Sequence, residues 1–305
     1  MSFKHWLAGI GLAAAIVLPA SAQQGPLVEA EWLAKNLQNP KVRVLEVSVD
    51  PGVYERGHIP GAVNVNWHTD LVDPVRRDIA SPENFKKLIE KAGITKDTTV
   101  VLYGDNNNWF AAWGAWVFDV YGIDAKLLDG GRKYWEAKGL PLDSAVPNHQ
   151  ASKYDLPKPN LSLRARLADV SKAVADKNAT LVDILSPAEY SGKIFAPEGV
   201  KELSVRAGHI PGAKNVPWGK AVDPATGKFL PKEQLAKVYA AEGIDGKQPI
   251  ITYCRIGERS SHTWFALAKI LGYKNVKNYD GSWTEYGNTV GLPIANLSGT
   301  VWNGK

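Results

Sequence analysis

The sequence predicts an α/β protein made of two tandem copies of one domain, each a parallel sheet flanked by helices. The first observation is an internal repeat: the eleven residues from Gly57 to Trp67 recur from Gly208 to Trp218 with nine identical positions. Shorter matches along the chain keep the offset near 150 residues, whereas a solenoid repeats at a much shorter period. The second observation is that short β-branched runs alternate with helical patterns, which indicates parallel strands with helices on both faces.

The first residues have the pattern of a secretory signal peptide. A positively charged start precedes an apolar stretch from Trp6 to Leu18, and an Ala-x-Ala ending follows. A membrane anchor is the alternative, but the stretch is shorter than the roughly 20 residues that span a bilayer. We therefore expect residues 1–22 to be cleaved off after Ala22, and the mature protein to be periplasmic or secreted, without a membrane partner.

The rest of the chain divides into two domains and a linker. We place the first domain at residues 24–143, the linker at residues 144–160, where prolines and polar residues gather, and the second domain at residues 161–305. Without the signal peptide the chain is longer than one typical domain of roughly 100–150 residues.

Four elements of the second copy follow from their patterns. Residues 181–184 and 250–253 are expected to be strands, and residues 232–242 and 261–271 are expected to be helices. Ligands of open parallel sheets bind beyond the carboxyl ends of the strands. The residue after Tyr253 is therefore a candidate for the site.

The composition is that of an ordinary globular protein, with 45% hydrophobic and 22% charged residues. Lysine and arginine exceed the acids by 36 minus 31, a surplus of five. That surplus favours small anionic substrates, but without a basic stripe it does not indicate nucleic acid binding. A single cysteine excludes an internal disulfide.

Cys254 is that single cysteine, and it is a candidate nucleophile. It stands between a strand pattern and a helix pattern, in a short loop with Gly257 and two arginines, Arg255 and Arg259. Backbone N–H groups, the helix dipole and guanidinium groups at such a place favour thiolate over thiol. The alternative is a small buried hydrophobic residue, for which the flanking arginines are poorly suited.

The first copy lacks this chemistry. An alignment of the copies on Tyr103 and Tyr253 places Gly104 opposite Cys254, and residues 105–109 opposite residues 255–259. With neither thiol nor guanidinium in its loop, the first copy is expected to be catalytically silent, as a scaffold and one wall of a cleft.

With these motifs in view, the chain resembles the tandem-domain rhodanese family of sulfurtransferases, most closely its thiosulfate sulfurtransferases. Residues 54–65 look like the family's amino-terminal signature, residues 254–259 like its six-residue active loop, and residues 279–286 like its carboxy-terminal signature. The resemblance implies that the loop backbone cradles the sulfur of Cys254, which takes a sulfane sulfur from thiosulfate and passes it from a persulfide to cyanide or a thiol. It implies no cofactor and no metal ion.

The residues in and beneath this loop each have an expected role. Arg255 and Arg259 bind the donor or stabilise the thiolate, and an ion pair of Arg259 with Glu258 or a helix-start contact is the alternative. Ile256 belongs to the cradle, and Gly257 permits positive φ or close approach to the anion. The Glu258 side chain is expected to point outward, away from an anionic intermediate. Asp183 and Ser260 are expected to organise the loop.

Two comparisons concern the reaction. Arginine directly after the cysteine resembles the thiosulfate type more than the 3-mercaptopyruvate type, which stays an alternative. Four residues between Cys254 and Arg259, rather than five, make phosphatase or arsenate reductase activity an unfavoured interpretation. A non-enzymatic sulfur carrier or redox partner is the alternative of another class.

Departures from the family pattern lie in the second copy. Leu185 stands where family members often have arginine, and the stretch from Tyr190 to His209 is fifteen residues longer than its counterpart. We hypothesise that Arg206 or Lys193 from this insertion replaces the missing cation, and a solvated charged loop is the alternative.

Two groups of residues are expected to have structural roles. The histidines of the repeated motif, His58 and His209, occur in both copies and are expected to brace turns rather than to act as bases. The tryptophans are expected to pack in the core or between the domains, although Trp109, Trp113 and Trp116 could face the cleft.

Overall fold

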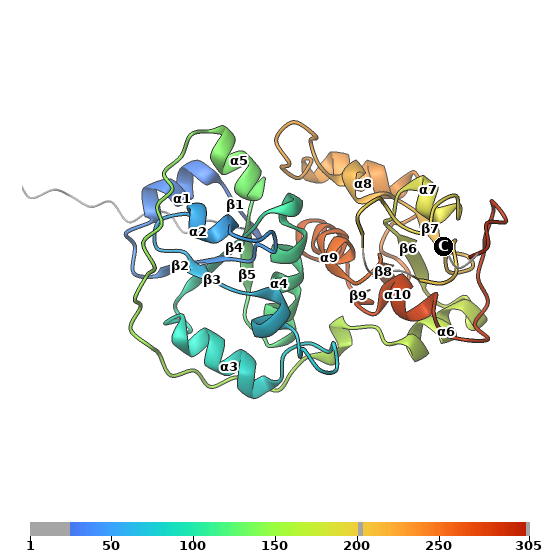
Figure 1. The fold of residues 1–305 in the computed structure, drawn as a ribbon, viewed down its shortest axis with the longest axis horizontal. Coiled ribbons are helices and arrows are strands. Elements are labelled where there is room, and N and C mark those ends of the chain that lie inside the picture. Colours follow the sequence, from blue (N-terminus) through green and yellow to red (C-terminus); the bar gives the residue numbers. More distant parts are fainter. Residues whose placement is uncertain (1–24, 201–203, 303–305) are drawn as a thin grey trace, which may run out of the picture.

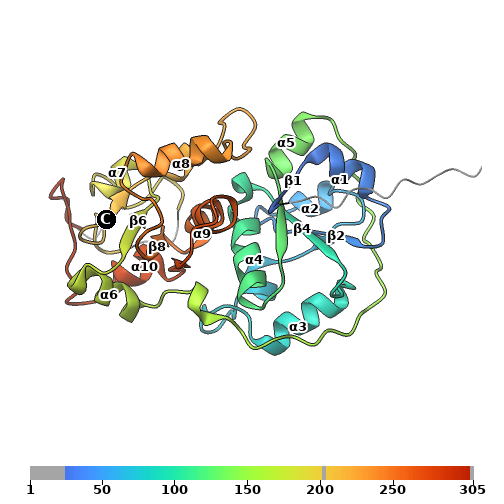
Figure 2. The same ribbon diagram turned by 180° about the vertical axis from the view of Figure 1, so that it is seen from behind.

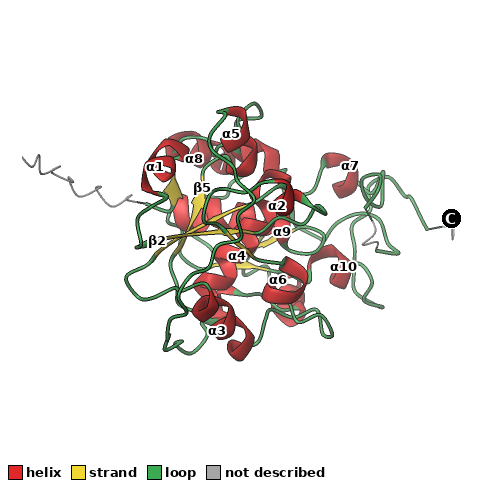
Figure 3. Cartoon of the chain, turned by 60° about the vertical axis from the view of Figure 1, so that its left-hand side comes forward, coloured by secondary structure: helices red, strands yellow, loops and turns green. Residues whose placement is uncertain are grey.

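The computed structural model describes residues 25–200 and 204–302, and the predicted signal peptide lies outside these residues. Two parallel sheets form, each flanked by helices, as predicted (Figures 1 and 3). The strand order is β1-β5-β4-β2-β3 in the first domain and β7-β6-β8-β9 in the second.

The first domain alternates strands and helices along the chain, which is the pattern of parallel sheets with crossover helices. Its elements are β1 (Leu27–Val28), α1 (Ala30–Asn36), β2 (Val42–Glu46), α2 (Val53–Arg56), β3 (Val63–Asn64), α3 (Pro82–Lys91), β4 (Thr99–Tyr103), α4 (Trp109–Val120), β5 (Ala125–Leu128) and α5 (Gly131–Ala137).

The second domain repeats this order after the linker, but without a counterpart of β1. Its elements are α6 (Leu167–Asp176), β6 (Thr180–Asp183), α7 (Pro187–Tyr190), β7 (Lys214–Asn215), α8 (Lys232–Ala240), β8 (Ile250–Tyr253), α9 (Glu258–Phe265), β9 (Val276–Asn278) and α10 (Ser282–Tyr286).

The expected elements of the second copy are present, with one informative shift. The helix predicted for residues 261–271 begins three residues earlier, at Glu258, and continues as a π-helical turn over Ala266–Ile270. The shift occurs because Gly257, at φ +100°, forms the cap and the last two loop residues already lie in the first turn. The loop thus runs directly into α9.

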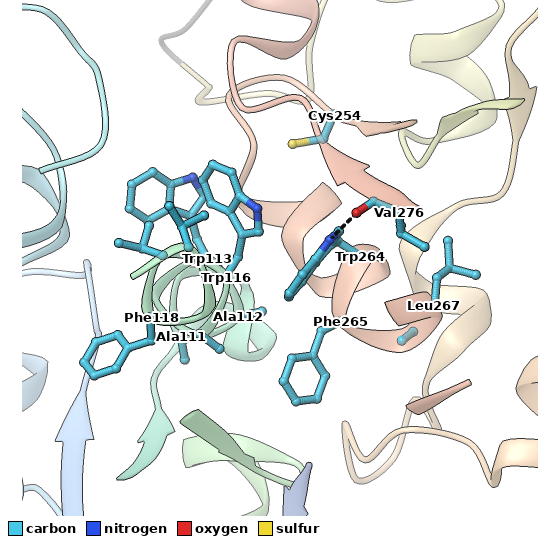
Figure 4. Close-up of a cluster of buried hydrophobic side chains, with 14 of the residues drawn as sticks. Ala111, Ala112, Trp113, Trp116, Phe118, Cys254, Trp264, Phe265, Leu267 and Val276 are labelled. Carbon is cyan, nitrogen blue, oxygen red and sulfur yellow. Dashed lines mark hydrogen bonds between the residues drawn. The ribbon is translucent and has the colours of Figure 1, made fainter. Parts of the chain in front are cut away.

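The two domains pack through α4 and α9, which lie side by side (Figures 1 and 2). Figure 4 shows Trp113 and Trp116 of α4 beside Trp264 and Phe265 of α9, with Cys254 at the edge of this cluster. All four aromatic side chains are fully or almost fully buried. The interface therefore has the character of a domain core, which fixes α9 and the loop before it.

The linker is extended and packs on the first domain (Figure 1). Ser152 N donates to Glu90 O at 2.9 Å, and Asn160 N donates to Val120 O at 2.7 Å. Among the described residues, no helix combines the length and the hydropathy needed to cross a membrane.

Candidate active site

Cys254 follows the carboxyl end of β8, an interior strand whose Tyr253 pairs with Asp183 of β6. Its side chain is fully buried. The Gly257 amide donates to Sγ at 3.1 Å, and Cys254 N donates to Ser282 Oγ at 3.1 Å. The sulfur therefore lies inside a backbone cradle, as the loop pattern predicts.

Gly257 shapes this cradle. Its φ of +100° lies in the left-handed region, and a Cβ at this position would lie 2.6 Å from the Asp280 Cα. The expected positive φ at Gly257 is therefore confirmed, and the close approach of Asp280 leaves no room for a side chain. The turn aims its N–H group at the sulfur.

The environment of Cys254 contains groups that favour the thiolate and groups that oppose it. Burial and the neighbouring Glu258 carboxylate raise the pKa of the Cys254 thiol to about 11, against the lowering effects of Arg259 and Ser260. Desolvation penalises the charged sulfur, and the motif alone did not reveal how completely the loop is covered.

Glu258 points inward, contrary to the sequence-based expectation that it faces solvent. It is only 7% exposed, and Sγ of Cys254 donates to its Oε2 at 3.3 Å. Its other oxygen, Oε1, lies 3.4 Å from Nε of Arg259. The first turn of α9 places Glu258 four residues after Cys254 and turns it back over the loop.

Arg259 is held between two carboxylates. Its terminal nitrogens each lie 3.4 Å from an oxygen of Glu189, and its Nε faces Glu258. The guanidinium carbon lies 5.8 Å from the ring centre of Trp109, which comes from the first domain. The ion pair with Glu258 considered from the sequence is thus present, and Trp109 forms a wall of the site.

Arg255 connects the active loop to the insertion. It is 2% exposed, and its Nη1 donates to the carbonyl oxygen of Phe195 at 2.7 Å. The inserted segment therefore lies over the loop. Ile256, by contrast, faces the other domain: Arg77 donates to its carbonyl oxygen.

Arg206 does not replace the missing cation at the reactive loop, contrary to the hypothesis. The Arg206 guanidinium donates to four main-chain carbonyl oxygens of residues 286–292, at 2.7–3.0 Å, and so organises the chain after α10. Lys193 is exposed. Arg259 of the loop itself acts electrostatically on the Cys254 thiol and lowers its pKa.

Asp183 and Ser260 lie beneath the loop. Asp183 is fully buried and accepts a hydrogen bond from Leu185 N at 2.8 Å. Ser260 Oγ lies 3.0 Å from Gly257 O and 2.7 Å from Asn278 Oδ1, which ties the turn to β9.

A cavity of about 560 Å³ lies between the domains next to Ile256. Its lining includes Trp67, Arg77, Arg164 and Asp280. A second cavity, of about 590 Å³, lies at the amino ends of β6 and β8, the ends opposite to Cys254.

In residues 25–200 and 204–302, His, Cys, Asp and Glu form no group of three that could hold a metal ion.

A family profile described as "Rhodanese-like domain" matches residues 29–138 and again residues 167–289. The chain belongs to the rhodanese-like family. Sulfur transfer is the chemistry that this family and the names of the relatives support.

The relatives cover nearly the whole chain. A "Putative thiosulfate sulfurtransferase" of Mycolicibacterium smegmatis is 52% identical over 275 residues, which are 90% of this chain and 98% of the relative. The "Sulfur carrier protein TtuD" of Thermus thermophilus is 50% identical over 274 residues, which are 88% of this chain and 96% of the relative. Among solved structures, the 3-mercaptopyruvate sulfotransferase SseA of Escherichia coli superposes with a TM-score of 0.72 at 27% identity, covering 85% of this chain and 99% of its own.

A cysteine at the corresponding place in the first rhodanese domain would clash with the main chain. The Asn108 side chain accepts a hydrogen bond from Gly104 N at 2.9 Å, and a Cβ on Gly104 would lie 2.3 Å from the carbonyl oxygen of Val47. The corresponding loop of the first domain thus has no space for a thiol side chain unless Val47 moves.

Gly104→Cys is therefore expected to create no second reactive thiol. It should lower the free energy of unfolding by about 1–3 kcal/mol, because Val47 must move to admit the side chain. Urea unfolding and counting of sulfur atoms bound per chain test both statements. A stable variant that binds two sulfur atoms would contradict them.

The repeated histidines brace turns, as expected. The His58 ring stacks on Tyr54 with ring centres 3.8 Å apart, and the His209 ring stacks on Tyr190 at 3.6 Å. Each Nδ1 also contacts the carbonyl oxygen of its tyrosine. Their equivalent contacts in the two domains indicate a role in folding.

Three residues of the site were missed by the sequence analysis. Glu189 is almost completely buried against Arg259, and its signal was the capping box that it forms with Ser186 at the start of α7. Ser282 Oγ, which holds Cys254 N, lies 4.0 Å from the sulfur. Arg77 has a positive φ of +56°, and the repeat aligns it with Gly227, which has a φ of +72°. The alignment of an arginine with a glycine was therefore the signal for an unusual backbone conformation at Arg77.

The buried Asp183 gives a prediction on stability. Burial raises its pKa from 3.8 to about 7, so the folded protein binds this proton more tightly than the unfolded chain does. The stabilisation that protonated Asp183 provides is complete at pH values below the pKa of Asp183 in the unfolded chain. It is lost as the pH rises through about 7, the pKa in the folded protein. Between pH 4 and pH 8, the free energy of unfolding should therefore decrease less steeply with pH in Asp183→Asn than in the wild type. Urea titrations at several pH values measure it, and equal slopes in both proteins would refute this account.

Proposed function

We propose that this protein is a sulfurtransferase that moves the sulfane sulfur of thiosulfate to cyanide or a thiol through a persulfide on Cys254. The observation that carries the proposal is the position of the single cysteine in a six-residue loop. Its sulfur accepts a hydrogen bond from the Gly257 N–H group at 3.1 Å. The name of the Mycolicibacterium smegmatis relative, at 52% identity, supports thiosulfate as the donor.

The chemistry of the loop suits this reaction. The Cys254 sulfur attacks the outer sulfur of thiosulfate, the sulfur–sulfur bond of the donor breaks, and sulfite leaves with the electron pair. The persulfide keeps a negative charge, which backbone N–H groups can stabilise without reorganising. Cyanide or a thiolate then takes the outer sulfur and returns the electron pair to Cys254.

Two other functions have specific support. The fold of SseA, at 27% identity, favours 3-mercaptopyruvate as an alternative donor. The Thermus thermophilus relative, at 50% identity and named a sulfur carrier, favours a protein that only passes sulfur to a dedicated partner.

A comparison of donors decides among these functions. The purified protein should form thiocyanate from cyanide more efficiently with thiosulfate than with 3-mercaptopyruvate, measured as kcat/KM. The reverse order would support the mercaptopyruvate reaction. Negligible turnover of both donors, with a persulfide formed only from a partner protein, would support the carrier.

The place of action is a second proposal. Residues 1–22 carry the pattern of a signal peptide, and we propose that the protein acts in the periplasm or outside the cell after cleavage behind Ala22. The amino terminus of the protein purified from its native cells should then be Gln23. An intact amino terminus on protein from the cytoplasmic fraction would contradict export.

A further inference from the structure

The cavity of about 560 Å³ between the domains lies directly beside the reactive loop, because Ile256 of that loop lines it. Ile256 is also the one residue of the six-residue loop that is partly exposed, whereas the other five, Cys254 included, are buried. A compound that comes from solvent therefore reaches the loop on the side of this cavity.

The acids in the lining of this cavity are already paired. Arg164 binds the two carboxylate oxygens of Asp280 at 3.0 and 3.1 Å, and it also donates to Asp78. The third acid of the lining, Glu285, is exposed and interacts with Tyr279. The charges of Asp78 and Asp280 are thus compensated from within the protein, so they do not exclude an anionic ligand.

Two further guanidinium groups of the lining have N–H groups to spare. Arg77 Nη1 lies 3.6 Å from Asp280, and Arg166 Nη1 lies 3.6 Å from Asp78, and both distances are longer than a hydrogen bond. Among the residues that the structure describes, Arg77 Nη2 alone of these groups makes a hydrogen bond, to the carbonyl oxygen of Ile256. The two side chains are 39% and 56% exposed, so a ligand can reach them. Guanidinium groups with open N–H donors suit a carboxylate or another oxyanion.

Arg77 is held at this cavity in a strained backbone conformation. Its φ of +56° lies in the left-handed region, where the repeat places a glycine, Gly227, in the second domain. Its guanidinium carbon lies 5.2 Å from the ring centre of Trp67, which also lines the cavity. Backbone strain at a residue other than glycine is typical of functional sites. The first domain thus gives this cavity a cation that the equivalent turn of the second domain lacks.

We propose that this cavity holds the anionic end of the thiol that receives sulfur from Cys254, with Arg77 and Arg166 as its cationic contacts. The inference rests on the proposed sulfur transfer and adds the class of acceptor, which is a thiol of peptide size with at least one carboxylate. Its size follows from the volume, since a cavity of about 560 Å³ holds a drug-sized ligand and is far larger than thiosulfate or cyanide.

The transfer to such an acceptor is balanced. The acceptor thiolate attacks the outer sulfur of the Cys254 persulfide, and a new sulfur–sulfur bond forms on the acceptor. The bond between the outer sulfur and Sγ breaks, and its electron pair returns to Sγ. The acceptor leaves as a persulfide anion, so neither a proton nor an oxidant is needed in this step. The two arginines take no part in the bond changes and act by binding the carboxylate.

The experiment compares two acceptors that differ in their carboxylates, glutathione and glutathione diethyl ester, with cyanide as the reference acceptor. Release of sulfite from thiosulfate by the full mature chain gives kcat and KM for each of them. The variants are Arg166→Gln, which touches no residue of the loop, Arg77→Gln, and the double variant. The matched control is Arg56→Gln, which changes an exposed arginine of the first domain that donates to Pro51 O. Thermal unfolding of each variant accompanies the rates.

We expect the wild type and Arg56→Gln to use glutathione at least about tenfold more efficiently than the diethyl ester, measured as kcat/KM relative to cyanide. Arg166→Gln should reduce this preference about threefold and Arg77→Gln about tenfold, because exposed ion pairs contribute less than partly buried ones. The loss should lie in KM for glutathione, and the double variant should treat the two acceptors alike. A general disturbance of the loop would lower turnover of all three acceptors together and leave the preference unchanged.

A wild type that uses the diethyl ester as efficiently as glutathione would overturn the proposal, and so would variants that keep the preference of the wild type. Calorimetric binding of S-methylglutathione separates the site from the reaction, because this compound has no thiol. Binding that weakens in Arg77→Gln and Arg166→Gln, in a protein that takes no sulfur from thiosulfate, contradicts the proposed function and supports the site. Sulfur transfer to cyanide without any binding of S-methylglutathione supports the proposed function and refutes the site.

Discussion

Cys254→Ser is expected to abolish sulfur transfer completely. A serine hydroxyl in the same buried place cannot form a persulfide, and the chain holds no second cysteine. Formation of thiocyanate from thiosulfate and cyanide should fall to the rate without protein. Because serine is close to cysteine in volume, the thermal unfolding temperature should change little, which separates lost chemistry from lost folding. Any turnover above background would mean that the sulfur travels by another route.

Gly257→Ala is expected to have the second largest effect. The added Cβ would lie 2.6 Å from Asp280 Cα and 2.8 Å from Asp280 Cβ, and the residue would have to keep φ near +100°. Strain of this kind costs on the order of 1–3 kcal/mol, and relief requires the turn that aims the Gly257 amide at the sulfur to move. We expect kcat/KM to fall at least about 100-fold, because such positioning errors are costly in catalysis.

Gly291→Ala is the matched control for this change. Gly291 also has a positive φ, of +84°, but a Cβ there meets no atom within 4 Å. Gly291→Ala should therefore lose a similar amount of stability through backbone strain but keep full activity. Equal activity of both variants would show that the Gly257 turn does not shape the reactive loop.

The duplication and the position of the reactive loop could be predicted because both depend on local patterns. The repeat of residues 57–67 at residues 208–218 gave the two domains, and the β-branched run before Cys254 gave the strand that ends at the sulfur. Gly257 followed from the need for a turn between a strand and a helix.

The side chains around the sulfur could not be predicted, since they depend on tertiary packing. Charge alone suggested that Glu258 faces solvent, but the first turn of α9 is covered and Arg259 compensates the buried carboxylate. Arg206 was a reasonable cation by sequence, yet four carbonyl oxygens near α10 bind it. Contacts of Arg77 with Ile256 cross between domains, and no pattern within either copy encodes them.

The same limit applies to the ionisation of the thiol. The loop motif indicated N–H groups and guanidinium groups, which favour thiolate, and these groups are present. The motif carried no information on burial, which is the largest influence on the pKa of Cys254. Burial of the loop therefore raises the pKa of the Cys254 thiol against the effect of these groups.

The central claim is that Cys254 carries sulfur as a persulfide, and intact-mass measurement tests it most directly. After incubation of the mature protein with thiosulfate and removal of excess donor, the account predicts a gain of one sulfur atom per chain, which cyanide removes and Cys254→Ser does not show. An unchanged mass after thiosulfate, or a gain that persists in Cys254→Ser, would contradict it.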